Sequence, residues 1–356
     1  MPFAGHRMTE PSFLVVRLGS LGDIVHTFPA VAGLRQSFPK AKIIWLTHPR
    51  WTSLIETSLI KTSLEASTSP LASEIWEVES RSSASVRKII SRIREQQFTA
   101  AIDYQGLWKS AMLPFFAGVR QRIGFSSQTI REFGVPILYT DRVRCERVHI
   151  ADQNGELSQR AGARNAVAPF LLSVSALHEA FVLQLLRSSS IERYVVLSPA
   201  GGWRSKCWPP ERYGELCQQI RRQLGLRCVV NYGPGEDNCA AAVKAASGDA
   251  DPIAYNGSLA QLMVLLRNAR CVVGGDTGPL HLGVALGTPV AALFGPTDPA
   301  RNGPYSPGTC GEKLVVLRSH DAKTTHRRGD QPDPSLLALD VPTVFEAVRK
   351  QIEARR

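Results

Sequence analysis

The strongest chemical signal in the chain lies in two tight turns within its last third. Gly275-Asp276-Thr277-Gly278 follows an apolar run that begins at Cys271, and a helical pattern starts at once, with Thr277 placed to cap it and His281 one turn further on. Free N–H groups and the positive dipole end favour phosphate at a helix start. A second turn, 295–298, follows the next apolar run. The pair predicts a nucleotide diphosphate site at the carboxyl edge of a parallel sheet.

Two earlier loops carry residues that could complete such a site. The loop Gly201-Gly202 follows a strand-like run and is open enough for phosphate, and Lys206 lies a few residues later. Lys206 either neutralises a diphosphate leaving group or is an ordinary solvated lysine. After the next run, Glu236 or Asp237 could accept hydrogen bonds from ribose hydroxyls, although an acidic pair at a helix start has the same appearance.

A candidate acid–base residue lies near the N-terminus. The run 13–18 enters Gly19-Ser20-Leu21-Gly22, and Asp23 follows at the start of a helical pattern. On the sequence alone Asp23 is more readily a helix N-cap than a general base at the carboxyl end of a strand. His26, one turn later, could tune Asp23 or bind substrate, but a lone histidine is more often a packing residue. The glycines do not form G-x-G-x-x-G, so no dinucleotide fingerprint is predicted.

Composition limits the partners. The formal net charge of the 356 residues is +11, which favours an anionic partner: nucleic acid, an anionic membrane or a phosphorylated substrate. No zinc-finger or RNA-recognition signature is present, so nucleic acid is not expected. Seven cysteines without a C-x-x-C, and an isolated Asp249-Ala250-Asp251, give no convincing metal site. We expect no metal and a cytoplasmic protein, since neither a signal peptide nor a membrane span is recognisable.

A basic segment at 80–97 contains Arg87 and Lys88 beside an isoleucine stripe. It is either a solvated surface helix or a helix that meets acceptor phosphates or the membrane surface, and the two interpretations are about equally supported.

Alternating apolar runs and helical patterns predict an α/β fold with parallel sheets. We expect an N-terminal Rossmann-like domain over 1–187, a C-terminal one over 188–340, and a final helix within 341–356 that packs back on the N-terminal domain. The stretch 105–175 is expected to be largely irregular. The expected strands are 13–18, 43–46, 100–104, 194–198, 228–231, 271–274 and 290–294, and the expected helices 25–37, 85–96, 176–186, 210–224, 259–268, 279–286 and 341–353.

Five ordered segments together resemble the ADP-heptose:lipopolysaccharide heptosyltransferases of glycosyltransferase family 9, with those of type I the most similar. The segments are GSLGDIVHTFPA, AIDYQGLWKSA, KCWPPERY, GGDTGPLHL and FGPTDP. The resemblance implies a GT-B fold, with two Rossmann-like domains whose parallel sheets face across a cleft. It also implies inverting, metal-independent heptose transfer from ADP-heptose to the Kdo region of Kdo-lipid A, without a cofactor, by an enzyme peripheral to the cytoplasmic face of the inner membrane.

The resemblance also assigns roles. Asp23 would be the base, and Lys206 with Asp276, Thr277 and Gly278 would stabilise the leaving diphosphate. The remaining donor residues would be Gly201, Gly202, His281 and either Glu236 or Asp237. The acceptor, a lipid-linked anionic saccharide, would meet Ser20, Gly22, His26, Gln105, Lys109, Arg87 and Lys88.

The chain departs from the type I pattern in two places. Gly201 and Gly202 replace hydroxyl residues, and the loop 318–335 matches poorly and receives no role. The alternatives are a GT-B transferase or epimerase acting on another nucleotide sugar, and a non-catalytic nucleotide-binding protein of the same fold.

Overall fold

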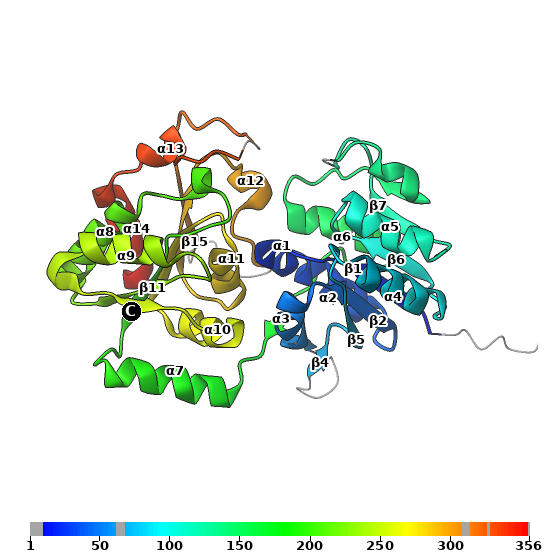
Figure 1. Ribbon diagram of the computed structural model, residues 1–356, viewed down its shortest axis with the longest axis horizontal. Coiled ribbons are helices and arrows are strands. Elements are labelled where there is room, and N and C mark those ends of the chain that lie inside the picture. Colours follow the sequence, from blue (N-terminus) through cyan, green and yellow to red (C-terminus); the bar gives the residue numbers. More distant parts are fainter. Residues whose placement is uncertain (1–9, 62–67, 131, 308–313, 326–327, 355–356) are drawn as a thin grey trace, which may run out of the picture. The chain divides into compact units, whose positions relative to one another are not determined.

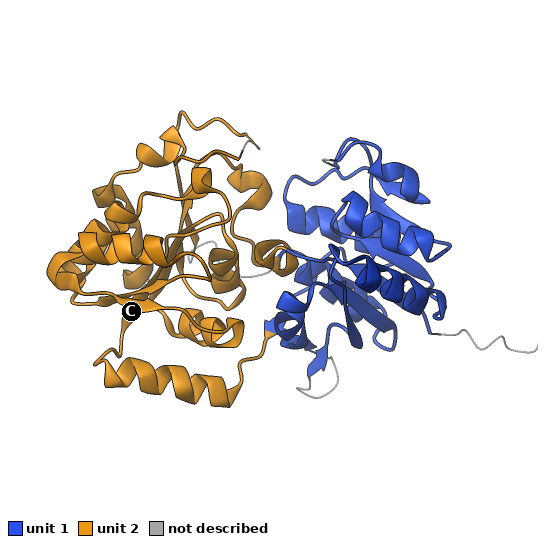
Figure 2. Cartoon of the chain, in the orientation of Figure 1, with its two compact units in different colours: residues 1–19, 26–171 blue, residues 20–25, 172–356 orange. Residues whose placement is uncertain are grey.

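The computed structural model describes residues 10–61, 68–130, 132–307, 314–325 and 328–354. The chain divides into two compact units, which Figure 2 colours separately. Unit 1 comprises the chain up to Gly19 together with His26–Leu171, and unit 2 comprises Ser20–Val25 together with the chain from Leu172 onward. Each unit contains a six-stranded sheet of its own.

The sheet of unit 1 has the strand order β5-β2-β1-β6-β7-β8, and every neighbouring pair is parallel (Figure 1). The order reverses between β1 and β6, so the loops after these two strands diverge there. Such a switch point is where ligands bind in doubly wound sheets. The strands are β1 (Ser12–Val16), β2 (Lys42–Thr47), β5 (Glu74–Glu77), β6 (Ala100–Asp103), β7 (Arg122–Phe125) and β8 (Asp141–Val143).

The sheet of unit 2 repeats this plan, with the order β12-β11-β10-β13-β14-β15 and parallel pairing throughout. Its switch point lies between β10 and β13. Both of these strands are completely buried, which explains their continuous apolar sequences. The strands are β10 (Tyr194–Ser198), β11 (Arg227–Asn231), β12 (Ile253–Tyr255), β13 (Cys271–Gly275), β14 (Val290–Phe294) and β15 (Leu314–Arg318).

Helices connect the strands of both sheets. Those of unit 1 are α2 (Phe28–Ser37), α3 (Thr52–Glu56), α4 (Ser83–Arg94), α5 (Trp108–Phe116) and α6 (Ile150–Arg160). Unit 2 contains α1 (Leu21–Val25), α7 (Ala176–Ser188), α8 (Pro210–Leu224), α9 (Asp237–Ala246), α10 (Leu259–Asn268), α11 (Gly278–Ala285), α12 (Pro299–Asn302), α13 (Pro334–Leu337) and α14 (Val341–Glu353). The short elements are β3 (Ser58–Lys61), β4 (Thr68–Pro70), β9 (Leu171–Leu172), η1 (Pro49–Trp51), η2 (Val135–Leu138), η3 (Arg204–Lys206) and η4 (Gly248–Ala250).

The α/β architecture with two parallel sheets is confirmed, but the division of the chain differs from the expected one. Helix α7 was placed in the first domain, yet it packs on α10 of unit 2 and its Glu179 pairs with Arg267 at 2.6 Å. The boundary therefore falls before α7 rather than at 188. The final helix α14 also differs from expectation, because Val344, Phe345 and Val348 are buried in the core of unit 2.

The stretch 105–175 was expected to be largely irregular, and this expectation is wrong. It contains α5, β7, β8 and α6, and β7 and β8 complete the sheet of unit 1. Helix α6 has few apolar residues, and polar contacts hold it in place. Buried Asn154 donates to the carbonyl of His26 at 3.1 Å, and Ser158 donates to that of Ala30 at 2.8 Å. The helix expected over 25–37 begins only at Phe28, as α2, and α1 precedes it as a separate short helix.

Candidate functional site

Three predicted donor residues meet at the switch point of unit 2. Lys206 lies on η3 after β10, and Asp276 follows β13. The Lys206 Nζ atom is 2.7 Å from Asp276 Oδ2, and Nε2 of His281 on α11 is 2.9 Å from Asp276 Oδ1. Each carboxylate oxygen therefore has one partner. Lys206 and Asp276 are 70 residues apart in the sequence, yet they form one compact polar cluster with His281.

The Asp276 carboxylate is held in its charged form. Burial alone would raise its pKa, since only 8% of the side chain is exposed. The hydrogen bond from His281 and the charge of Lys206 more than offset this desolvation, so the pKa of Asp276 lies far below its ordinary value. The ionised Asp276 carboxylate therefore orients the ammonium group of Lys206. Two of the three N–H donors of Lys206 remain for other partners.

Glycines allow the surrounding loops to approach closely. A Cβ on Gly275 would lie 2.5 Å from the carbonyl oxygen of Lys206, so only glycine fits beside the η3 loop. A Cβ on Gly201 would lie 2.7 Å from Cγ2 of Thr277. A Cβ on Gly202, by contrast, would meet nothing within 4 Å. The two loops therefore touch through Gly201 and Gly275, and the space at Gly202 stays open.

Two threonine hydroxyls in the predicted phosphate turns are buried without a partner among the described residues. Thr277 immediately precedes α11, but its side chain makes no capping hydrogen bond, contrary to the predicted cap. Thr297, in the turn after β14, is 2% exposed and its Oγ1 also lacks a partner in the part of the chain that is described. The sequence singled out both turns for phosphate but did not single out Thr297.

Asp23 lies three residues into α1 rather than at the N-cap. Helix α1 begins at Leu21, so Ser20 precedes it, and Asp23 Oδ2 accepts hydrogen bonds from Ser20 N at 3.2 Å and Ser20 Oγ at 2.9 Å. This is one half of a capping box, in which the third helical residue reaches back to the residue before the helix. The N-cap interpretation of Asp23 is corrected accordingly, while Ser20 orients its carboxylate.

Helix α1 packs directly on α11 within unit 2. A Cβ on Gly22 would lie 2.8 Å from Cδ2 of His281, and a Cβ on Gly278 would lie 2.6 Å from Cβ of Leu21. The absence of side chains at Gly22 and Gly278 is what permits this contact. It brings the helix that carries Asp23 against the helix that carries His281. The predicted base therefore lies in the same unit as the predicted donor cluster of Lys206, Asp276 and His281.

The two candidate ribose ligands differ in their surroundings. Glu236 is half-buried, and its Oε2 accepts from Gly233 N at 2.6 Å, so its side chain is folded over the loop after β11. Asp237 is exposed as the first residue of α9. Glu236 therefore faces the carboxyl edge of the sheet, and Asp237 has the position of an ordinary acidic residue at a helix start.

In unit 1, one predicted acceptor residue, Gln105, lies at the other switch point. Gln105 follows β6, and its Oε1 accepts from Leu18 N at 2.7 Å after β1. Buried Asp103, which the sequence analysis missed, organises the loop around Gln105, and burial raises its pKa although several donors oppose this. Asp103 accepts hydrogen bonds from Tyr139 Oη at 2.7 Å, Ser110 Oγ at 2.9 Å, Gln105 N at 2.9 Å and Gly106 N at 3.2 Å.

The acceptor candidates His26, Lys109, Arg87 and Lys88 are spread over unit 1, whereas Ser20 and Gly22 belong to unit 2. His26 is 5% exposed, and its ring stacks edge-on with that of His149 at 5.3 Å, which suits a packing role. Lys109 is exposed near the start of α5. Arg87 and Lys88 are exposed on α4, whose Ile89 and Ile93 are buried, so α4 is a surface helix with one basic face.

Comparison with known proteins identifies the family. The model of the family described as glycosyltransferase family 9 (heptosyltransferase) matches residues 86–330. The chain belongs to glycosyltransferase family 9. Lipopolysaccharide heptosyltransferase 1 of Escherichia coli K12 is 28% identical over 323 residues, which cover 86% of this chain and 93% of that protein.

Two solved structures show the same fold. E. coli heptosyltransferase WaaC with ADP has a TM-score of 0.71 at 25% identity, covering 96% of this chain and 99% of that one. E. coli ADP-heptose lps heptosyltransferase II has a TM-score of 0.77 at 21% identity, covering 97% and 99%. The protein is therefore a glycosyltransferase with the GT-B fold, as the sequence predicted.

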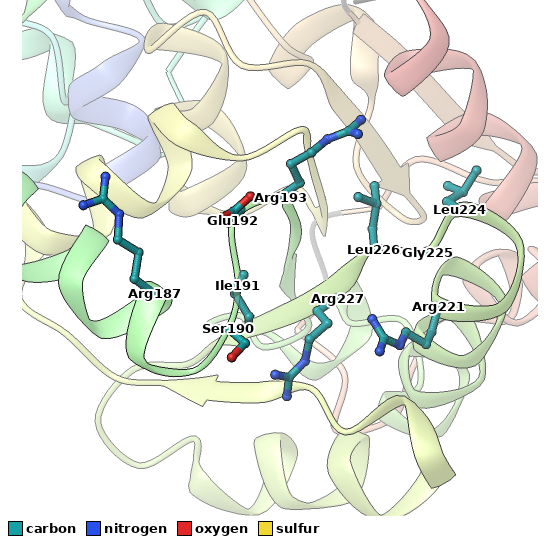
Figure 3. Close-up of a pocket in the computed structure, with 10 residues that line it drawn as sticks. All are labelled: Arg187, Ser190, Ile191, Glu192, Arg193, Arg221, Leu224, Gly225, Leu226 and Arg227. Carbon is teal, nitrogen blue, oxygen red and sulfur yellow. The ribbon is translucent and has the colours of Figure 1, made fainter.

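Three further observations define the limits of the site in this glycosyltransferase. Among the described residues, no helix is both long and apolar enough to span a membrane, and no three His, Cys, Asp or Glu side chains are grouped to hold a metal ion. A pocket rich in arginine lies at the amino ends of β10 and β11, with Arg193 and Arg227 in its wall (Figure 3). It is at the opposite edge of the sheet from Lys206, so it is separate from the donor cluster.

Proposed function

We propose that this family 9 enzyme transfers heptose from ADP-heptose to the Kdo region of the lipopolysaccharide inner core, with inversion and without a metal. The observation that carries the proposal is the joining of Asp23 on α1 to the Lys206–Asp276–His281 cluster through the contact of Gly22 with His281. The relatives support the sugar and the acceptor class, since they are lipopolysaccharide heptosyltransferases and one was solved with ADP.

The proposed reaction is a single displacement. Asp23 takes the proton from an acceptor hydroxyl, and that oxygen forms a bond to the anomeric carbon while the bond from this carbon to the ADP oxygen breaks. The departing diphosphate gains negative charge, which Lys206 stabilises as a positioned cation. Asp276 orients Lys206 and His281 but stays ionised. The N-terminus of α11 and the open loop at Gly202 offer backbone N–H groups to the same phosphates.

The remaining residues divide between donor and acceptor. We assign the ribose hydroxyls to Glu236, because its carboxylate is folded over the loop after β11 whereas Asp237 is exposed. The hydroxyls of Thr277 and Thr297 are donors for phosphate oxygens. On the acceptor side we retain all the predicted residues. Two of them also hold the loop before Asp23, since Gln105 accepts from Leu18 N and Ser20 donates to Asp23. The retained residues are Ser20, Gly22, His26, Gln105, Lys109, Arg87 and Lys88.

The experiment that tests the function is acceptor-dependent release of ADP from ADP-heptose, with Kdo-lipid A as acceptor. We expect ADP release only when both substrates are present, and a product with inverted anomeric configuration. Release should persist in excess EDTA, since no step requires a metal. Use of a UDP-sugar in preference to ADP-heptose, or release independent of acceptor, would contradict the proposal.

We also propose that the enzyme binds the membrane surface peripherally, through an aromatic face on unit 1. Trp108, Met112, Phe115 and Phe116 lie on one side of α5, and Phe133 and Ile137 flank them, being 99% and 70% exposed. Exposed apolar surface of this kind indicates an interaction site. Cations border it: Arg122 lies over the Phe115 ring at 5.3 Å, and Arg94 donates to the Phe116 carbonyl at 2.7 Å. This combination suits an anionic lipid surface.

The double variant Phe133→Ser, Ile137→Ser should bind phosphatidylglycerol vesicles at least tenfold more weakly than the natural protein. The reason is that burying each large apolar side chain is worth about 1.5–3 kcal/mol. Sedimentation with vesicles measures this. Leu177→Ser, at a residue 77% exposed on α7 of unit 2, is the control and should bind normally. Equal binding by both variants would exclude this face as the docking surface.

A further inference from the structure

The segment between β15 and α13, residues 319–333, connects the two phosphate-side loops of unit 2. Residues 326–327 lie outside the described part. At its first end the segment is anchored to the turn after β14, where Arg318 Nε donates to Gly295 O at 3.2 Å and Thr325 N donates to Pro296 O at 2.8 Å. Arg318 also donates to Thr324 Oγ1 at 2.9 Å. These bonds hold the first half of the segment against the turn that contains Thr297.

At its second end the same segment is bonded to the loop that carries Lys206. Ser205 N donates to Gly329 O at 3.3 Å, and Gly329 N donates to Ser205 Oγ at 3.4 Å. Asp333 N donates to Ser205 O at 3.3 Å. Ser205 is 5% exposed, so its own atoms in these hydrogen bonds are buried, whereas Gly329 is exposed. Ser205, the residue before Lys206, is thus hydrogen-bonded to a segment that lies more than 120 residues later in the sequence.

Two cations share the Trp203 ring at this point. Lys206 Nζ lies 4.5 Å from the ring centre, and the guanidinium of Arg328 lies 5.0 Å from it. Since both distances are measured to the centre of one ring, the two positive charges lie within about 10 Å of each other. Asp276 neutralises Lys206, but no ion pair of Arg328 is found among the described residues. A multiply charged anion beside Lys206 would therefore be attracted by both cations.

We propose that residues 328–333 form a strap that fixes the Lys206 loop, and that Arg328 supplies a second positive charge to the diphosphate of the donor. The proposal deepens the donor site and rests on the proposed role of Lys206. Ser205 and Gly329 are positioning residues, since they act through the η3 loop. Arg328 acts electrostatically, with its side chain arranged by Trp203.

The charge half of the proposal is tested by binding of ADP and of adenosine to the full chain, measured by calorimetry. Arg328→Gln should weaken ADP binding about tenfold and leave adenosine binding unchanged, and its ADP affinity should depend less steeply on salt. Arg328→Lys should restore most of the affinity. Lys323→Gln is the matched control, since it removes the same charge from an exposed residue of the same segment. Equal ADP binding by the two Gln variants, or parallel loss of adenosine binding, would overturn this half.

The positioning half is tested by hydrogen exchange, which needs no nucleotide. Ser205→Ala removes the acceptor for Gly329 N–H, so peptides containing Lys206 and peptides from 328–333 should both exchange at least tenfold faster. Ser319→Ala, which removes another hydroxyl from the segment, is the control and should leave the Lys206 peptide unchanged. Unchanged exchange of the Lys206 peptide in Ser205→Ala would overturn the strap. If the natural protein bound no ADP, the charge half and the proposed donor would fail, whereas the exchange result would still decide the strap.

Discussion

Asp23→Asn should lower the rate of acceptor-dependent ADP release by about 10²–10⁴-fold, the range typical for loss of a positioned general base. An amide cannot take the acceptor proton. Its oxygen can still accept the hydrogen bonds that Ser20 now donates to Asp23, so α1 should remain folded against α11. ADP affinity should therefore be unchanged, and the loss should appear in kcat. Steady-state kinetics with Kdo-lipid A, together with ADP calorimetry, measures both quantities.

The capping role of Asp23 requires its own control. Ser20→Ala removes the hydroxyl partner of Asp23 but keeps the carboxylate, so it should cost far less activity than Asp23→Asn. Asp340→Asn makes the same chemical change at another helix start in unit 2, where Asp340 accepts from Thr343 N at 2.9 Å, and should leave kcat unaltered. If Ser20→Ala and Asp23→Asn lost activity equally, Asp23 would be a structural cap and the base would have to be sought elsewhere.

The meeting of Lys206, Asp276 and His281 could be predicted because these residues follow buried parallel strands. Apolar runs such as Cys271–Gly275 fix where a strand ends, and residues that follow strands β10 and β13 must meet at one edge of the sheet. Lys206, Asp276 and His281 therefore came together as expected. The hydrogen bonds between them could not be foreseen, since rotamers and loop paths decide which oxygen meets which nitrogen.

The errors arose where polar residues are buried. Helix α6 was missed because Asn154 and Ser158 are used for specific bonds inside unit 1, and such helices lack a clear apolar periodicity. Asp23 was placed at the N-cap but is the third helical residue, because the glycine-containing turn hides the helix start at Leu21. Asp103 and the Ser205–Gly329 contact depend on pairing between distant segments, which no local pattern records.

Lys206→Met should reduce kcat/KM for the nucleotide sugar by about 10²–10³-fold, the cost expected for one group that stabilises developing negative charge. Methionine keeps most of the apolar stem but removes the cation. Lys244→Met is the matched control, since Lys244 is an exposed lysine of the same unit whose surface ion pair with Asp251 spans 3.5 Å. A normal kcat/KM in Lys206→Met would remove Lys206 from the stabilisation of the leaving group.

The same substitution should shift acid unfolding, because Lys206, together with His281, holds the pKa of Asp276 low. A carboxylate whose pKa is depressed on folding adds stability above its unfolded pKa, near 3.8, and this stability is lost as the pH falls toward the folded value. Without the charge and hydrogen bond of Lys206 the folded pKa of Asp276 should rise, while the contact with His281 continues to lower it. The variant should then unfold at a higher pH than the natural protein, as followed by circular dichroism. Lys244→Met should not show this shift, because its partner Asp251 is exposed and its pairing is screened by solvent. Coincident acid-unfolding curves for all three proteins would mean that His281 alone suffices to keep Asp276 ionised.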